Sequence, residues 1–105
     1  DGKQTLSENI ADLGGLEIAY EAYMKTVTAT GEERNHLGRE FFRAFAVAWM
    51  RNATAEAMQS YKTDEHACHK LRVNGNVNLT DEWYDLFNIK SGKMYLKPEQ
   101  RITIW

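Results

Sequence analysis

Apolar residues recur every three or four positions in the first part of the chain, which is the spacing of one face of an amphipathic helix. This stripe consists of Leu6, Ile10, Leu13, Leu16, Tyr20, Tyr23 and Val27. We therefore expect a first helix over about 6–29.

Gly31 and the charged residues that follow it interrupt the apolar pattern. A second stripe then carries Leu37, Phe41, Phe42, Phe45, Ala48 and Trp49. It predicts a helix over about 37–61, in which Thr54 could cap a short final stretch.

The periodicity disappears between Lys62 and Leu79, where polar residues and the Asn74-Gly75 pair predict an irregular connection with a turn. Such a long loop is unusual in a small domain, and long loops are often functional. A short helix over about 80–88 follows, and we expect the tail 94–105 to be extended. The predicted fold class is mainly α.

Composition narrows the function classes without selecting one. The 105 residues, of which 43% are hydrophobic, are enough for one small domain. A formal net charge of −2 argues against nucleic acid as a partner, because phosphate binders normally carry positive charge. No apolar run approaches the roughly 18–20 residues that cross a bilayer. Cys68 is the only cysteine, so it cannot form an internal disulfide.

Two carboxylates stand out on the first predicted helix. Glu8 and Asp12 are four residues apart, so they project from the same side, beside the small residues Gly15 and Ala19. They could hold a metal ion or a proton. Residues Thr5 to Glu8 also fit a capping box, in which Glu8 reaches back to the start of the helix. Spacing alone does not choose between these interpretations.

Four segments carry a recognisable motif each. The first is Thr5-Leu-Ser-Glu-Asn-Ile-Ala-Asp-Leu-Gly-Gly-Leu16. The others are Phe41-Phe42-x-x-Phe45-Ala46-x-x-Trp49, His66…Arg72-Val-Asn-Gly75 and Met94-Tyr95…Arg101-x-x-x-Trp105. In this order they resemble the neprilysin and endothelin-converting-enzyme family of zinc metalloendopeptidases. The resemblance spans the whole chain, at the carboxy-terminal end of the family's thermolysin-like catalytic domain.

The resemblance implies a catalytic zinc ion with three protein ligands and an open position for water. Glu8 matches the family's third ligand. Asp12 matches an aspartate that holds a zinc-bound histidine and assists proton transfer. His66 matches a histidine that stabilises the oxyanion formed when zinc-activated water attacks a peptide carbonyl. Arg72 matches an arginine that hydrogen-bonds the backbone of the bound peptide. The implied activity is hydrolysis of peptide bonds in oligopeptides.

The chain departs from the family pattern in two places. Ala67-Cys68-His69 stands after His66, where the family commonly has Ser-Pro-Gly, so the loop could be placed differently. Met50 and Thr103 or its neighbours stand where animal members usually carry cysteines. A version without those disulfides resembles a bacterial member, and the family then favours an exported, periplasmic or cell-surface protein.

The chain contains no His-Glu-x-x-His motif, which supplies the family's other two zinc ligands and its general base. We therefore expect residues 1–105 to be the carboxy-terminal portion of a catalytic domain, inactive and zinc-free when isolated. The expected partners are peptide substrates and the upstream part of the same domain. An uncovered helix flank at Glu8, Gly15 and Ala19 could also let the fragment self-associate.

Two alternatives from other classes stay open at this point. One is a stand-alone helical interaction module without catalysis, which shares only ancestry with the peptidases. The other is a small metal-binding protein that uses His66, Cys68 and His69, although three such residues without a distant fourth ligand are a weak signal.

Overall fold

The computed structural model describes residues 2–49 and 69–104. Its elements are α1 (Gly2–Thr26), α2 (Gly31–Ala48), α4 (His69–Val77), α5 (Asp81–Phe87) and the short 3₁₀ helix η1 (Pro98–Gln100). The part of the chain so described contains no strand, so the predicted mainly α class is confirmed. None of the helices within it is long and apolar enough to cross a membrane.

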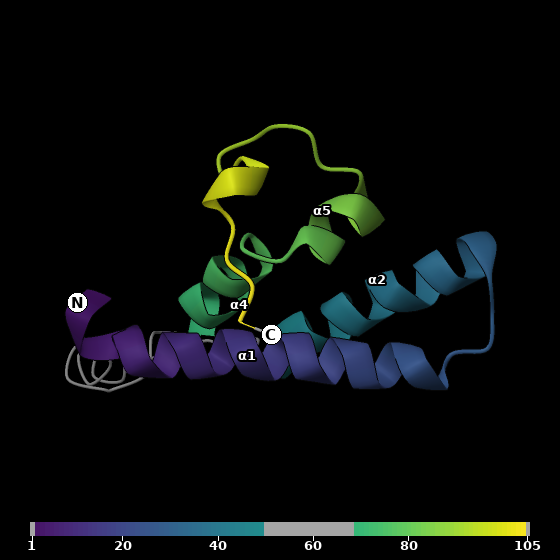
Figure 1. Ribbon diagram of the computed structural model, residues 1–105, viewed down its shortest axis with the longest axis horizontal. Coiled ribbons are helices and arrows are strands. Elements are labelled where there is room, and N and C mark those ends of the chain that lie inside the picture. The colour runs from purple at the N-terminus through teal and green to yellow at the C-terminus, as the bar shows by residue number, and fades with distance from the viewer. Residues whose placement is uncertain (1, 50–68, 105) are drawn as a thin grey trace.

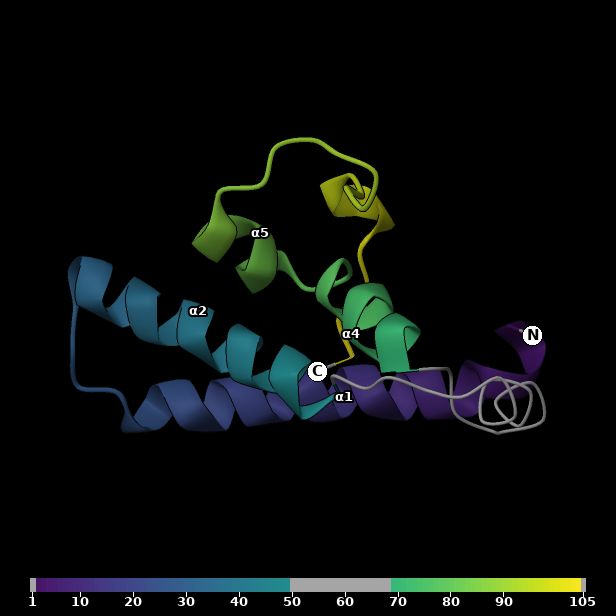
Figure 2. The same ribbon diagram turned by 180° about the vertical axis from the view of Figure 1, so that it is seen from behind.

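The long helix α1 forms the base of the molecule, and α2 returns beside it after a short turn (Figure 1). The elements α4, α5 and η1 lie together on one side of this pair. Seen from behind, the first turns of α1 extend beyond α4 (Figure 2). The first turns of α1 are therefore the part of this helix that the described elements cover least.

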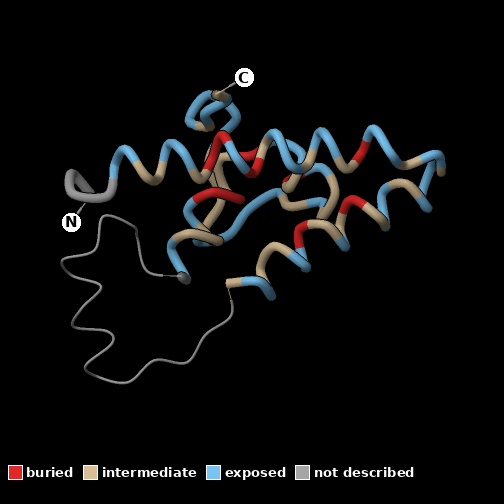
Figure 3. The backbone as a smooth tube through the Cα atoms, turned by 90° about the horizontal axis from the view of Figure 1, so that it is seen from below, coloured by how far each residue is buried: buried red, intermediate tan, exposed pale blue. Residues whose placement is uncertain are grey.

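One apolar cluster joins three of the helices. Leu16 of α1, Phe42 of α2 and Val77 of α4 are each at most 5% exposed and form its centre. Partly buried residues pack around them: Tyr20, Phe41, Phe45, Val73, Trp83, Leu86, Phe87 and Met94. Buried positions alternate with exposed ones along α1 and α2, as expected for amphipathic helices (Figure 3).

The turn between α1 and α2 lies earlier than predicted. The sequence predicts a break at Gly31 and a helix from 37, but α2 already begins at Gly31. Its first turn carries Glu32 and Glu33, which favour the positive end of the helix dipole but provide no apolar stripe. Arg34 then donates hydrogen bonds to the carbonyl oxygens of Met24 and Val27, at 3.3 and 3.2 Å, and so closes the end of α1.

Residues 69–77 form helix α4, so the predicted irregular connection with a turn at Asn74-Gly75 is wrong there. Asparagine and glycine are weak helix formers, which is why the sequence favours a loop. Tertiary contacts override this preference, because Val77 is buried against α1 and α2. Thr80 Oγ1 also donates to the carbonyl oxygen of Asn76, at 3.0 Å, and satisfies one of the last carbonyls of α4. The remainder of the predicted loop, and the end of the helix predicted over 37–61 with Thr54, lie outside the described residues.

Helix α5 confirms the short helix predicted over 80–88. Its last residue, Phe87, is followed by the C-cap residue Asn88, which has a left-handed backbone with φ of 54°, a conformation that asparagine tolerates. Gly38 lets α2 approach α5 closely, because a Cβ atom at this position would lie 3.0 Å from the side chain of Leu86. The two helices thus pack without space for a side chain at their crossing.

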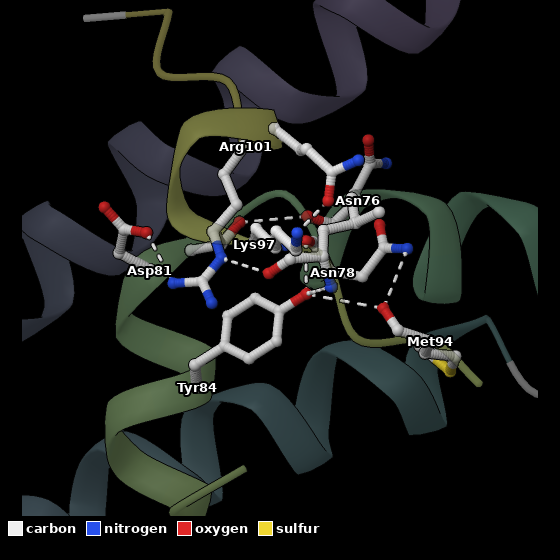
Figure 4. A network of polar contacts seen from close by, with 10 residues as sticks. Asn76, Asn78, Asp81, Tyr84, Met94, Lys97 and Arg101 are labelled. Atoms are coloured by element: carbon white, nitrogen blue, oxygen red, sulfur yellow. Dashed lines mark hydrogen bonds and ion pairs between the residues drawn. The ribbon is translucent and has the colours of Figure 1, made fainter. Parts of the chain in front are cut away.

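The C-terminal tail is extended apart from η1, and a polar network attaches it to α5 (Figure 4). The hydroxyl of Tyr84 donates to the carbonyl oxygen of Asn78, at 2.7 Å, and accepts from the backbone N–H of Leu96, at 2.9 Å. Arg101 lies over the Tyr84 ring, with 3.6 Å between its Cζ atom and the ring centroid. It donates to the Leu96 carbonyl oxygen and to Asp81, each at 3.0 Å.

The end of the tail returns to α1. The backbone N–H of Ile104 donates to the carboxylate of Glu17, at 3.0 Å to the nearer oxygen. This contact joins residues 87 positions apart in the chain. The tail therefore holds α5 and α1 together.

Candidate functional site

Glu8 and Asp12 lie in the interior of α1, and both are half-buried. Because α1 begins at Gly2, Thr5 is a residue of the helix and not its N-cap. The capping-box interpretation is therefore wrong. The carboxylates share one helix face, as their spacing predicts, and Glu8 is not needed to start the helix.

Asp12 forms a bidentate ion pair with Arg72, which lies on α4. Nε and Nη2 of Arg72 donate to the two carboxylate oxygens, at 2.7 and 2.6 Å. Both side chains are largely buried, with 15% of Arg72 and 18% of Asp12 exposed. Such parallel hydrogen bonds hold the two planar groups edge to edge. The sequence singles out both residues, and the structure brings them together.

Trp49 is the second residue that contacts the Arg72 guanidinium. The Cζ atom of Arg72 is over the Trp49 ring, 3.9 Å from its centroid. Trp49 follows the last residue of α2, and its backbone N–H donates to the Ala46 carbonyl oxygen at 3.1 Å. The sequence motif contains Trp49, but its spacing gives no sign that it meets an arginine 23 positions later.

A groove of about 280 Å³ opens beside the Asp12–Arg72 pair. Three helices line it with mostly small or apolar side chains: Ala11, Asp12, Gly15, Leu16, Ala19, Phe41, Phe45, Trp49 and Arg72. A Cβ atom on Gly15 would have no other atom within 4 Å, so this flank of α1 is open. Gly15 and Ala19 thus provide the small-residue groove that the sequence predicts.

The remaining candidate site residues are His66, Cys68 and His69. His66 and Cys68 lie outside the described residues, so the geometry of the predicted oxyanion contact is not described. His69 is the first residue of α4. Among residues 2–49 and 69–104, no group of three His, Cys, Asp or Glu side chains is arranged to hold a metal ion.

A second cavity, of about 310 Å³, involves none of the predicted site residues. It is lined by Glu17, Tyr20, Glu21, Met24, Lys25, Arg34, Thr80, Glu82 and Thr103. Burial raises the pKa of Tyr20, and the negative charges of Glu82 and Asp85 raise it further. The Tyr20 hydroxyl therefore stays protonated at neutral pH. No sequence motif marks this cavity, because its lining comes from four separate segments.

The whole chain matches known peptidases. The model of the family described as peptidase family M13 matches residues 1–102. Neutral endopeptidase from Lactobacillus helveticus is 38% identical over 107 residues, and mouse neprilysin (Mus musculus) is 36% identical over 112 residues. Neprilysin-3 from Drosophila melanogaster is 34% identical over 114 residues. No solved structure matches the chain.

These matches define the class of the protein, and they confirm the resemblance drawn from the four motifs. The chain belongs to peptidase family M13. Each of the three relatives covers 100% of the chain, whereas the chain spans only about 15% of the length of these relatives. The relatives include proteins of bacteria and of animals.

Proposed function

We propose that residues 1–105 are the carboxy-terminal portion of the catalytic domain of a zinc metalloendopeptidase. The match of the family over 1–102 supports this, as does the small share of each relative that the chain spans. The chain also lacks a His-Glu-x-x-His motif, so two zinc ligands and the general base would come from the upstream part of the domain. The proposed reaction is hydrolysis of peptide bonds in oligopeptides.

One observation carries this proposal most strongly. The bidentate Asp12–Arg72 pair lines an open groove, on the same helix face as Glu8. Two sets of residues that the resemblance assigns to zinc and to substrate are thus adjacent, although 60 positions separate Asp12 and Arg72.

The residues present fit one part of a zinc site. Glu8 offers a half-buried carboxylate, which is a common zinc ligand. We propose that it provides the third ligand and that the other two are histidines from upstream. A zinc ion bound there supplies a water activated for attack on a peptide carbonyl.

The Asp12 carboxylate can accept hydrogen bonds from two different groups at the same time. An ionised carboxylate has about four lone-pair positions, and the bidentate contact with Arg72 uses two of them. The others can accept a hydrogen bond from a histidine bound to zinc and so fix its orientation. Asp12 would therefore connect the metal ligand to the residue that binds substrate.

Arg72 is the residue proposed to bind the backbone of the peptide. Two of its five N–H groups bind Asp12, which leaves three for other acceptors. His66 is proposed to stabilise the oxyanion as it develops, a role for a donor placed close to the scissile carbonyl.

The direct test uses the full-length protein encoded by the reading frame that contains this chain. We expect it to bind one zinc ion and to cleave peptides, with activity lost on treatment with a chelator and restored by zinc. The isolated fragment should show neither activity nor tight zinc binding, since one carboxylate cannot replace three ligands. Zinc-dependent cleavage by the fragment, or a full-length protein without zinc, would contradict the proposal.

We also propose that the upstream part of the domain packs against the flank of α1 that carries Gly15 and Ala19 and forms the far wall of the groove, while the end of the groove at Asp12 and Arg72 stays open to substrate. In the full-length protein, Gly15→Leu should then reduce activity strongly, because the added side chain would occupy the packing surface. Gly75→Leu is the matched control, since a Cβ atom on Gly75 also has no other atom within 4 Å. In the isolated fragment the same exposed flank could mediate self-association, which light scattering would detect as a dimer that Gly15→Lys disrupts.

The reading frame separates this proposal from a stand-alone helical interaction module. A His-Glu-x-x-His motif upstream supports the peptidase, and a start codon directly before Asp1 supports the module. The family resemblance further suggests an exported, periplasmic or cell-surface enzyme of a bacterium, which fractionation of the cells of its source would test.

A further inference from the structure

The guanidinium of Arg72 is held by residues from two other helices. Asp12 of α1 binds one edge of the group through Nε and Nη2. Trp49, which follows the end of α2, covers a face of the group at 3.9 Å. Arg72 itself is carried by α4. The position of this one cation is therefore determined jointly by three helices.

The two contacts restrict different motions. A bidentate pair keeps the guanidinium and the carboxylate edge to edge, but it leaves them able to hinge about the line that joins the two carboxylate oxygens. An aromatic ring against the face of the guanidinium opposes that hinge, because tilting would break the stacking and the cation–π attraction. Together, Asp12 and Trp49 fix both the direction and the plane of the Arg72 side chain.

The fixed plane matters because of the donors that it leaves. None of the described residues accepts a hydrogen bond from Nη1 of Arg72. Arg72 also lines the groove of about 280 Å³, so this end of the guanidinium is available to a ligand in the groove. A donor pair of fixed direction binds a carbonyl oxygen more strongly than a mobile one, since less conformational entropy is lost on binding.

We propose that Trp49 is a positioning residue that holds the guanidinium of Arg72 in the orientation needed to bind a backbone carbonyl of the peptide. The part of this inference that concerns the peptide rests on the proposed function. The part that concerns the orientation of Arg72 does not. Trp49 acts through Arg72, and this dependence distinguishes the role from simple packing in the groove.

The first test measures the orientation without using peptidase activity. Phenylglyoxal modifies arginine side chains, and mass spectrometry of the digested full-length protein gives the rate at each position. With Trp49→Leu we expect the modification of Arg72 to become roughly 3- to 30-fold faster, the range that corresponds to loss of a cation–π contact. Trp49→Phe retains an aromatic face and should give an intermediate rate.

Arg101 is the internal control, since it is also stacked on an aromatic ring and paired with an aspartate. Its modification rate should be unchanged by either substitution of Trp49. Trp83→Phe is the matched variant, because it changes a half-buried tryptophan of α5 that does not contact Arg72. An unchanged rate at Arg72, or equal increases at Arg72 and Arg101, would overturn the inference. If Trp49→Leu does not fold, the comparison of Trp49→Phe with Trp83→Phe decides the question.

The second test uses steady-state kinetics of the full-length enzyme. Trp49→Leu should raise KM roughly 3- to 30-fold and leave kcat within about twofold, because peptide binding and not zinc chemistry is affected. In an Arg72→Met background the same substitution should have little further effect on KM. An equal effect on KM with and without Arg72 would show that Trp49 contacts the peptide independently, and would overturn the positioning role. If the wild-type protein lacks peptidase activity, the proposed function fails, and the modification rates still judge the orientation of Arg72.

Discussion

Arg72 and Arg101 have the same kinds of partner but use them differently. Each guanidinium lies over an aromatic ring, Trp49 in one case and Tyr84 in the other, and each pairs with an aspartate. Arg72 makes two short hydrogen bonds to Asp12, which is 18% exposed. Arg101 makes one at 3.0 Å to an aspartate that is 61% exposed.

The difference lies in what the remaining donors do. Arg101 directs Nε to the carbonyl oxygen of Leu96, so it closes the tail on itself. Arg72 directs Nε and Nη2 to a single carboxylate and lines an open groove. An aromatic ring and an aspartate therefore give Arg101 a structural role and make Arg72 a candidate binding group. Substitutions beside the groove should change catalysis as well as stability, and those on the tail side should change stability alone.

The largest effect on catalysis is expected at His66, to which the family resemblance assigns a role in the reaction. In the full-length enzyme His66→Phe should retain zinc but lower kcat by roughly 100-fold or more, the usual result of removing a donor to the oxyanion. KM should change much less, because the contact strengthens only as charge develops. Zinc analysis and steady-state kinetics measure this, with His36→Phe on the exposed face of α2 as the control. A variant that lost zinc instead would contradict the assigned role.

Substitutions of the two aspartates should lower the stability of the protein by clearly different amounts. Asp12→Asn leaves a largely buried guanidinium without its counter-charge and should lower the free energy of unfolding by about 2–4 kcal/mol. Asp81→Asn removes an exposed ion pair and should cost less than about 1 kcal/mol. Urea unfolding of both variants checks this. Equal losses of stability would contradict the proposed difference between the largely buried Asp12–Arg72 pair and the exposed Asp81–Arg101 pair.

Substitutions of the two arginines should separate an effect on peptide binding from an effect on folding stability. Arg72→Met should keep zinc but weaken peptide binding by about 1–3 kcal/mol, the scale of a lost charged hydrogen bond. Arg101→Met should leave KM unchanged and lower the unfolding temperature, since its partners are the tail and α5. KM values and thermal unfolding of the pair give the result. The assignment fails if Arg72→Met strips the metal.

The smallest effect is expected from one hydroxyl on the tail side. Tyr84→Phe keeps the ring under Arg101 but removes the group that joins the Asn78 carbonyl oxygen to the Leu96 N–H. We expect a loss of about 1–2 kcal/mol of stability, because two backbone groups lose their partner. Activity should not change. A decrease in kcat with an unchanged free energy of unfolding would show that Tyr84 contributes to catalysis and would contradict its structural role.

Parts of the fold with a regular apolar stripe could be predicted from the sequence, such as α1 around Leu13 and Leu16. Helix α4 could not, because Asn74, Gly75 and Asn76 have weak helix propensity and only contacts with distant segments stabilise the helix. The start of α2 was also not visible, since its first turn is polar. Local patterns thus fail where tertiary contacts or helix-end electrostatics decide the structure.

The candidate site, too, could be predicted only in part from the sequence. Spacing places Glu8 and Asp12 on one face of a helix, and the family resemblance adds His66 and Arg72. Neither could show that Asp12 and Arg72 bind each other or that Trp49 stacks on the guanidinium, because these contacts join distant parts of the chain. Such pairings depend on how three helices meet, which the sequence pattern does not specify.

The most direct test of the central claim is the zinc content of Glu8→Gln in the full-length protein, measured beside its peptidase activity. A neutral amide is a poor replacement for an anionic zinc ligand, so zinc and activity should be lost together. Glu21→Gln is the matched control on the exposed part of the same helix and should retain both. A Glu8→Gln protein with a full complement of zinc and unchanged activity would contradict the account.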